Sequence, residues 1–115
     1  MDMKKDNQIL VSLIENLMKE KKPIWKKVAH ELSKPRRQRT EVNLSKLEEY
    51  AGDGTTILVP GKVLGAGAVS KKVTVAAFSF SDKARQIISA AGGKTMTIES
   101  LHKSNPDAKG VMILK

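Results

Sequence analysis

A short basic stretch is the part of this sequence with the clearest chemical consequence. Lys34-Pro35-Arg36-Arg37-Gln38-Arg39 holds four cations and no acidic residue. The surrounding segment, residues 19–39, has nine lysines and arginines but only two glutamates, so it carries +7 of the net charge of +9. The planar guanidinium of arginine contacts phosphate in a bidentate manner, and clustered cations are the usual footprint of a nucleic-acid binder. The stretch therefore predicts a polyanionic partner.

An aromatic residue stands inside the same basic segment. Trp25 lies between Lys22 and Lys26-Lys27. Its ring could stack on a base or sugar, or it could anchor the hydrophobic core. Both interpretations stay open at the level of the sequence.

The glycine-rich segment Pro60–Ser70 resembles two nucleotide-binding motifs but fits neither. A phosphate-binding loop of the Walker type needs Ser or Thr after Gly-Lys, and Gly61-Lys62 is followed by Val63. A dinucleotide fingerprint must open a helix, whereas Gly65-Ala66-Gly67 is followed by Lys71-Lys72 and then a strand pattern. We interpret the segment as a tight loop that brings the backbone close to another segment or to a phosphate.

Residues for catalysis or metal binding are sparse. The chain has no cysteine, and His30 and His102 lie far apart in the sequence. Glu48 and Glu49 are adjacent and cannot face each other on one helix. No catalytic site, metal site or cofactor is predicted.

Length and composition point to one soluble domain with an extension. The chain has 115 residues and a pI of about 9.9. No stretch approaches the ~20 apolar residues that span a bilayer, and polar residues interrupt the apolar segment Ile9–Met18, so no secretory signal is predicted. The basic stretch has too little apolar area for a membrane-surface helix. We expect an intracellular protein that binds nucleic acid.

The elements that must position these residues follow from apolar periodicity and turn signals. Helices are predicted at 9–18, 23–32, 42–50, 82–91 and 98–104, and strands at 56–60, 73–80, 94–97 and 111–114. The fold class is α/β (α+β type). The expected division is a helical, basic, phosphate-facing extension at 1–51 and a compact β/α domain at 52–115.

A DNA-binding helix-turn-helix is the alternative interpretation of the helical part. That motif joins its helices by a turn of ~3–4 residues. Here the connection from Ser33 to Thr40 is about twice as long and contains Pro35. A sequence-specific DNA-binding regulator is therefore the second hypothesis.

Several motifs closely resemble the archaeal form of the large-subunit ribosomal protein eighteen-e family. In the basic half these are Pro23-Ile24-Trp25 with Val28-Ala29, and the run from Lys34 to Lys46. In the second half they are Val59–Gly65, Lys72–Ser81, Ala84-Arg85, Ala91–Gly93, Asn105-Pro106 and Gly110-Val111. The resemblance covers essentially the whole chain from about Asn7.

The resemblance implies a structural, non-catalytic constituent of the large ribosomal subunit in the cytoplasm. Its partners would be large-subunit ribosomal RNA and neighbouring ribosomal proteins, with no membrane, small-molecule substrate, cofactor or homo-oligomer. It also implies a C-terminal part shared with bacterial ribosomal protein fifteen, an irregular superhelix of β-β-α turns. Met112 stands where we expect the family pattern to have a cation, which argues against an RNA contact from the last strand.

The residues expected to contact RNA come from the basic stretch and from the matching motifs. The cations of the stretch would bind phosphates along a loop that is disordered until RNA is present. Loop glycine would permit close approach to the RNA backbone. The full set is Lys22, Trp25, Lys26, Lys34, Arg36, Arg37, Arg39, Asn43, Ser45, Lys46, Lys62, Gly65 and Lys72.

Overall fold

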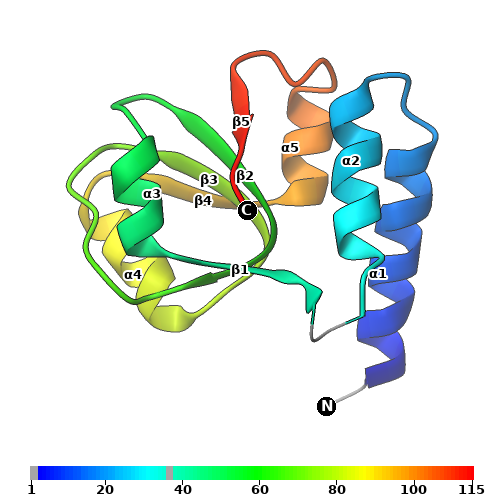
Figure 1. The fold of residues 1–115 in the computed structure, drawn as a ribbon, viewed down its shortest axis with the longest axis horizontal. Helices are drawn as coiled ribbons and strands as arrows, with labels where there is room; N and C mark the ends of the chain where they lie inside the picture. The colour runs from blue at the N-terminus through cyan, green and yellow to red at the C-terminus, as the bar shows by residue number, and fades with distance from the viewer. Residues whose placement is uncertain (1–2, 36–37) are drawn as a thin grey trace. The chain divides into compact units, whose positions relative to one another are not determined.

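A computed structural model describes residues 3–35 and 38–115 of the chain, and side chains from Gln8 onward. The chain divides into two compact units, Met1–Arg39 and Thr40–Lys115 (Figure 1). Each unit is considered separately below.

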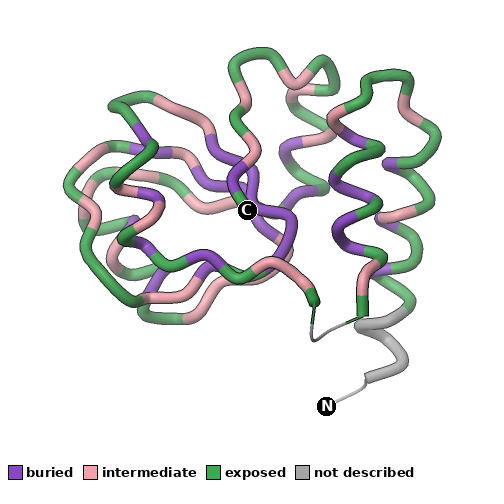
Figure 2. Tube along the Cα trace, in the orientation of Figure 1, coloured by how far each residue is buried: buried purple, intermediate pink, exposed green. Residues whose placement is uncertain are grey.

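The first unit is a pair of helices, α1 (Met3–Met18) and α2 (Pro23–Leu32), as the sequence predicts. Pro23 begins α2, where its missing N–H is not needed. The buried residues of each helix recur at helical spacing, and α1 and α2 pack side by side (Figure 1). Figure 2 shows this buried stripe in purple, and its members are Leu10, Leu13, Leu17, Trp25, Val28, Ala29 and Leu32.

The second unit is built on a five-stranded sheet whose recorded pairings are all parallel. Its strands are β1 (Thr40–Asn43), β2 (Thr56–Leu64), β3 (Thr74–Phe80), β4 (Lys94–Thr97) and β5 (Val111–Ile113). The order is β1-β2-β3-β4, and β5 also pairs with β2. Because β3 occupies one edge of β2, β5 and β1 follow one another along its other edge, at Thr56–Leu58 and Gly61–Leu64.

Three short helices cover the two faces of this sheet. Helices α3 (Leu44–Tyr50) and α4 (Asp82–Ala90) share one hydrophobic core with the sheet, and α5 (Ile98–Ser104) packs against β3 and β4 (Figure 1). The core cluster contains Leu44 and Leu47 from α3, Ala84 and Ile88 from α4, and alternate strand residues such as Val59. The intervening strand residues point to the opposite face.

The elements with strong local signals are confirmed, together with the α/β fold class. Ser81 caps α4, since its Oγ accepts a hydrogen bond from the backbone N–H of Ala84 at 3.1 Å. In β3, Val75, Ala76 and Ala77 are all buried, so both faces of this strand are covered as expected.

The predicted helix at 42–50 is wrong in its first part. Thr40–Asn43 is strand β1, and the helix starts only at Leu44. Val42 pairs with Val63 of β2 and is 1% exposed, so burial in the sheet outweighs the helical spacing of Val42 with Leu44 and Leu47. Strand β1 therefore depends on a contact between residues distant in sequence.

Strand β2 runs four residues beyond the predicted end at Pro60. Proline has no N–H for the ladder, and the pairing with β3 shifts register between Val59 and Lys62. This irregularity accommodates Pro60 and Gly61 and lets the strand continue to Leu64.

The boundary between the compact units falls after Arg39 because Thr40–Asn43 belongs to the sheet. The expected RNA-binding extension, 1–51, therefore includes residues of the second unit. Its role as one functional region stays a prediction.

Candidate nucleic-acid interface

The lysines around the start of α2 form an exposed basic surface. Lys22 is the N-cap residue of α2, and its backbone is extended (φ −70°, ψ 128°). The buried side of α2 carries Trp25 and Val28, which leaves the intervening lysines facing solvent. The exposed cations of this surface are Lys19, Lys21, Lys22, Lys26 and Lys27.

The expectation that Trp25 stacks on a base is not supported. Its side chain is 0% exposed, so the ring is enclosed by protein and has no free face. The alternative, a core anchor, is the role that the structure shows. Trp25 therefore offers no exposed ring surface on which an RNA base could stack.

The basic stretch is fixed at its two ends by its own contacts. Lys34 Nζ lies 2.9 Å from a carboxylate oxygen of Glu31, a side chain that is only 6% exposed. Arg39 Nε donates to the carbonyl oxygen of Lys34 at 3.1 Å, and Gln38 N donates to Pro35 O at 2.8 Å. The positive charge of Lys34 is therefore partly neutralised by a buried carboxylate.

The central arginines of the stretch, Arg36 and Arg37, lie outside the described residues. Arg39 uses one of its five N–H donors on Lys34, so its terminal nitrogens remain available for phosphate. Ordering of this loop by RNA stays a prediction.

Three of the expected residues come together where β1 and β2 end. Asn43 is exposed at the N-cap of α3 and makes no side-chain capping bond. The backbone N–H of Ser45 donates to the carbonyl oxygen of Ala66 at 3.2 Å, which holds the glycine-rich loop against the start of α3. A Cβ on Gly65 would lie 2.8 Å from Lys83 Cβ, so the missing side chain makes room for α4. Of the two expected reasons for this glycine, close approach to another segment is the one observed.

The end of the glycine-rich loop and the residue after it contact the C-terminal part of α3. Ser70 Oγ donates to Glu48 Oε2 at 2.6 Å. Lys71 Nζ donates to the carbonyl oxygens of Glu48 and Ala51, at 3.0 and 2.7 Å, and so satisfies the C-terminal end of the helix. The loop is therefore held by the protein itself along its length.

The remaining lysines of the expected set do not gather in one place. Lys46 Nζ donates to the carbonyl oxygen of Lys115 at 2.6 Å. Lys62 is exposed and lies opposite Glu41 in the register of β1 and β2. Lys72 lies at the other end of the sheet, where its aliphatic chain would be 3.3 Å from a Cβ on Gly92.

Two exposed cations of α4 lie outside the set expected from the sequence. Lys83 is exposed beside Gly65, and the Arg85 guanidinium lies over the Phe80 ring at 5.8 Å from its centroid. The signal was present: a Ser81-capped helix with both cations in its first turn and a half.

The parts of the chain that the structure describes contain no cluster of metal ligands and no helix that could cross a membrane. Among the described side chains, those of residues 8–35 and 38–115, no three His, Asp or Glu gather as metal ligands. Over the same residues, every helix is too short or too polar to span a bilayer.

Comparisons with known proteins identify the family. The model of the family described as ribosomal protein 60S L18 and 50S L18e matches residues 3–115. Large ribosomal subunit protein eL18 of Archaeoglobus fulgidus is 50% identical over 97% of this chain and 99% of its own length. The proteins of the same name from Methanococcus maripaludis and Sulfurisphaera tokodaii are 49% and 42% identical, over 96% and 95% of this chain and 92% of their own lengths. This chain belongs to the family of ribosomal proteins 60S L18 and 50S L18e.

Proposed function

We propose that this chain is a structural constituent of the large ribosomal subunit that binds large-subunit ribosomal RNA. The observation that carries the proposal is the similarity to eL18 proteins over nearly the full length of both chains. The exposed lysines of the first unit and the net charge of +9 fit that role. The function is non-catalytic, and the site of action is the cytoplasmic ribosome beside neighbouring ribosomal proteins.

The binding mechanism is charge neutralisation by cations on residues 1–51. Arg36, Arg37 and Arg39 contact phosphates, and Lys22 and Lys26 extend the contact along α2. Each neutralised phosphate releases condensed counterions, which makes the affinity fall with salt. Lys34 contributes less than these, because Glu31 already pairs with it.

Asn43 and Ser45 add hydrogen bonds to the RNA where β1 ends. Both are exposed, and Asn43 has no capping bond to lose. Lys46, Lys62 and Lys72 lie at separate places on the second unit, so the RNA contacts the second unit at more than one place. The chain binds RNA by shape and phosphate, without reading one base sequence.

We also propose that the second unit has the same fold as part of bacterial ribosomal protein fifteen. The chain order of the second unit contains β2-β3-α4, a β-β-α turn, followed by β4-α5-β5. This order supports a common fold with bacterial ribosomal protein fifteen.

A salt series on the Arg36→Ala/Arg37→Ala/Arg39→Ala variant tests the proposal. Binding to large-subunit ribosomal RNA is measured for the whole chain, and the slope of log affinity against log salt should become shallower by roughly 2 to 3. The matched control, Lys94→Ala/Lys103→Ala/Lys109→Ala, removes the same charge from exposed positions outside the proposed interface and should change the slope by less than 1.

Two results would contradict the proposal, the first its binding mechanism and the second its RNA partner. Equal slopes for the arginine variant and the wild-type chain would remove the basic stretch from the interface. Duplex DNA that displaces the ribosomal RNA at equal nucleotide concentration would favour the DNA-binding alternative.

A further inference from the structure

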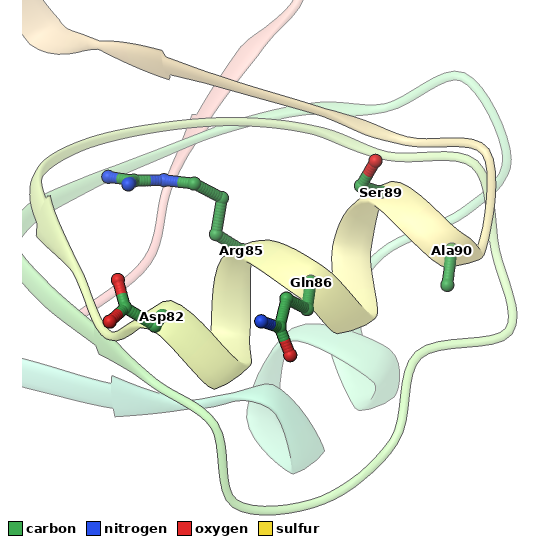
Figure 3. Close-up of a pocket in the computed structure, with 5 residues that line it drawn as sticks. All are labelled: Asp82, Arg85, Gln86, Ser89 and Ala90. Atoms are coloured by element: carbon green, nitrogen blue, oxygen red, sulfur yellow. The ribbon is translucent and has the colours of Figure 1, made fainter.

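The outer face of α4 is a polar surface that the interface described above does not use. Asp82, Arg85, Gln86, Ser89 and Ala90 line a shallow hollow of about 540 Å³. All five residues come from α4 at helical spacing and so share one side of the helix (Figure 3). Four of them are polar, and none is a large apolar residue.

The opposite side of α4 fixes this face in place. Ala84 and Ile88 are both 0% exposed and belong to the core of the second unit. The first turn is capped by Ser81, and the last turn is closed by Ala91 N donating to Ile87 O at 3.2 Å. The polar face therefore has a defined orientation before any partner binds.

Arg85 places an oriented positive charge at the hollow. Its guanidinium lies over the Phe80 ring, and Phe80 itself packs against the core cluster. Asp82, one turn earlier, forms no ion pair with it in the described structure. Arg85 thus keeps its planar fork for an external anion.

Gln86, Ser89 and Ala90 give the rest of the face its chemistry. A side-chain amide and a hydroxyl each donate and accept hydrogen bonds, and Ala90 leaves the surface low. The minor groove of an RNA double helix is wide and shallow and presents 2′-hydroxyl groups between phosphates. Besides one guanidinium and two uncharged hydrogen-bonding groups, the face carries the Asp82 carboxylate, which can accept a hydrogen bond from a 2′-hydroxyl group. This combination of groups is complementary to the 2′-hydroxyl groups and phosphates of that groove.

We propose that the α4 face binds the minor groove of a double-helical segment of large-subunit ribosomal RNA. Arg85 contacts a phosphate, and Gln86 and Ser89 contact 2′-hydroxyl groups. This inference rests on the proposed function and adds the surface and the form of RNA that it binds. A protein partner fits the face less well, because protein interfaces are centred on buried aromatic or other large anchors, which this face neither offers nor encloses.

Directed cleavage from α4 tests the inference. The chain has no cysteine, so a Ser89→Cys variant carries iron–EDTA at one position. On large-subunit ribosomal RNA the tethered iron should cleave both strands of one paired segment, with the cuts offset across its minor groove. The matched control, Ser100→Cys, places the same probe on exposed α5 and should cleave that segment weakly or not at all.

A second measurement reports on Arg85 itself. The Arg85→Ala variant should lower the slope of log affinity against log salt by about 1, while Ser100→Ala should leave it unchanged. If the label at Ser89 prevents binding, Ala90→Cys is the second attachment point. Loss of binding at both positions, with an unchanged thermal melt and normal binding by labelled Ser100→Cys, also places RNA on this face.

The outcomes separate this inference from the proposed function. Tight RNA binding by labelled Ser89→Cys, with cleavage no stronger than from Ser100→Cys, would overturn the α4 contact and leave the proposed function intact. Cleavage confined to single-stranded RNA would contradict the groove. Failure of the unmodified chain to bind ribosomal RNA would refute both.

Discussion

Glu31 shows how a single acidic residue can organise a basic surface. It is a buried acid, 4% exposed, within the most cationic segment of the chain. A buried carboxylate is unfavourable unless it is paired, and Lys34 supplies the pair at 2.9 Å. Glu31 therefore fixes the point at which the basic stretch leaves α2.

Removal of this carboxylate should destabilise the protein. We expect Glu31→Ala to lower the free energy of unfolding by about 1–2 kcal/mol, less than a fully buried pair because Lys34 is partly exposed. Urea denaturation of both proteins measures the difference.

Glu99→Ala is the matched control for Glu31→Ala. Glu99 and Lys103 form an i, i+4 ion pair at 3.1 Å, whereas Glu31 and Lys34 are an i, i+3 pair, and both side chains of the Glu99 pair are more than half exposed. Its loss should cost no more than about 0.5 kcal/mol. Equal effects of the two substitutions would show that burial does not strengthen the Glu31 pair.

Trp25 should matter for stability and not for RNA affinity. Trp25→Leu keeps an apolar side chain in the core but removes the stacking surface, so RNA affinity should change by less than about twofold. A stacked base would instead contribute about 1–3 kcal/mol, or roughly 5- to 150-fold in affinity. Filter binding, at a temperature where the variant is folded, distinguishes these two changes in RNA affinity. A roughly 5- to 150-fold loss would show that Trp25 belongs to the interface.

The structure agrees best with the sequence where only the exposure of a cation is concerned, and the RNA-binding role of these residues stays a prediction. Lys22 and Lys26 are exposed as expected. Gly65 and Lys46 differ because their neighbours, Lys83 and Lys115, lie far away in sequence, which no local pattern records. The charge of Arg85 was visible in the sequence, but its position over Phe80 required the packing of α4.

At the scale of elements, the pairing of β1 with β2 depends on a glycine. A Cβ on Gly61 would overlap the carbonyl group of Thr40 across the two strands. Gly61→Ala should therefore weaken β1 and lower the free energy of unfolding by about 1–3 kcal/mol.

Gly52→Ala is the control for this substitution. Gly52 is exposed, and its added Cβ would lie 3.5 Å from Thr55 Oγ1, an ordinary contact. Its effect in urea denaturation should stay within about 0.5 kcal/mol. A Gly61→Ala variant as stable as Gly52→Ala would show that β1 is not held closely against β2.

The elements predicted correctly from the sequence are those whose boundaries are set by residues within them or next to them. Ser81 and the Gly92-Gly93 pair bracket α4, and Pro23 marks the start of α2. The strand at Thr40–Asn43 was missed because its burial comes from Val63, about twenty residues later. The extension of β2 past Pro60 was missed for a related reason, since the register shift that tolerates proline exists only in the assembled sheet.

At the scale of the whole molecule, charge and fold are divided between two units. Most of the net charge lies in residues 19–39, whereas the parallel sheet and its main core lie in the unit that begins at Thr40. The second unit still offers polar groups at the start of α3 and on α4. This division predicts that salt weakens RNA binding mainly through the first unit.

Sedimentation of large ribosomal subunits tests the central claim most directly. Subunits from cells that make this chain are run through a sucrose gradient in high salt, and the chain is quantified in each fraction. The account predicts that the chain migrates with the large subunit in equimolar amount and is released when nuclease digests the RNA. A chain that remains at the top of the gradient, or that stays bound after the RNA is digested, would contradict it.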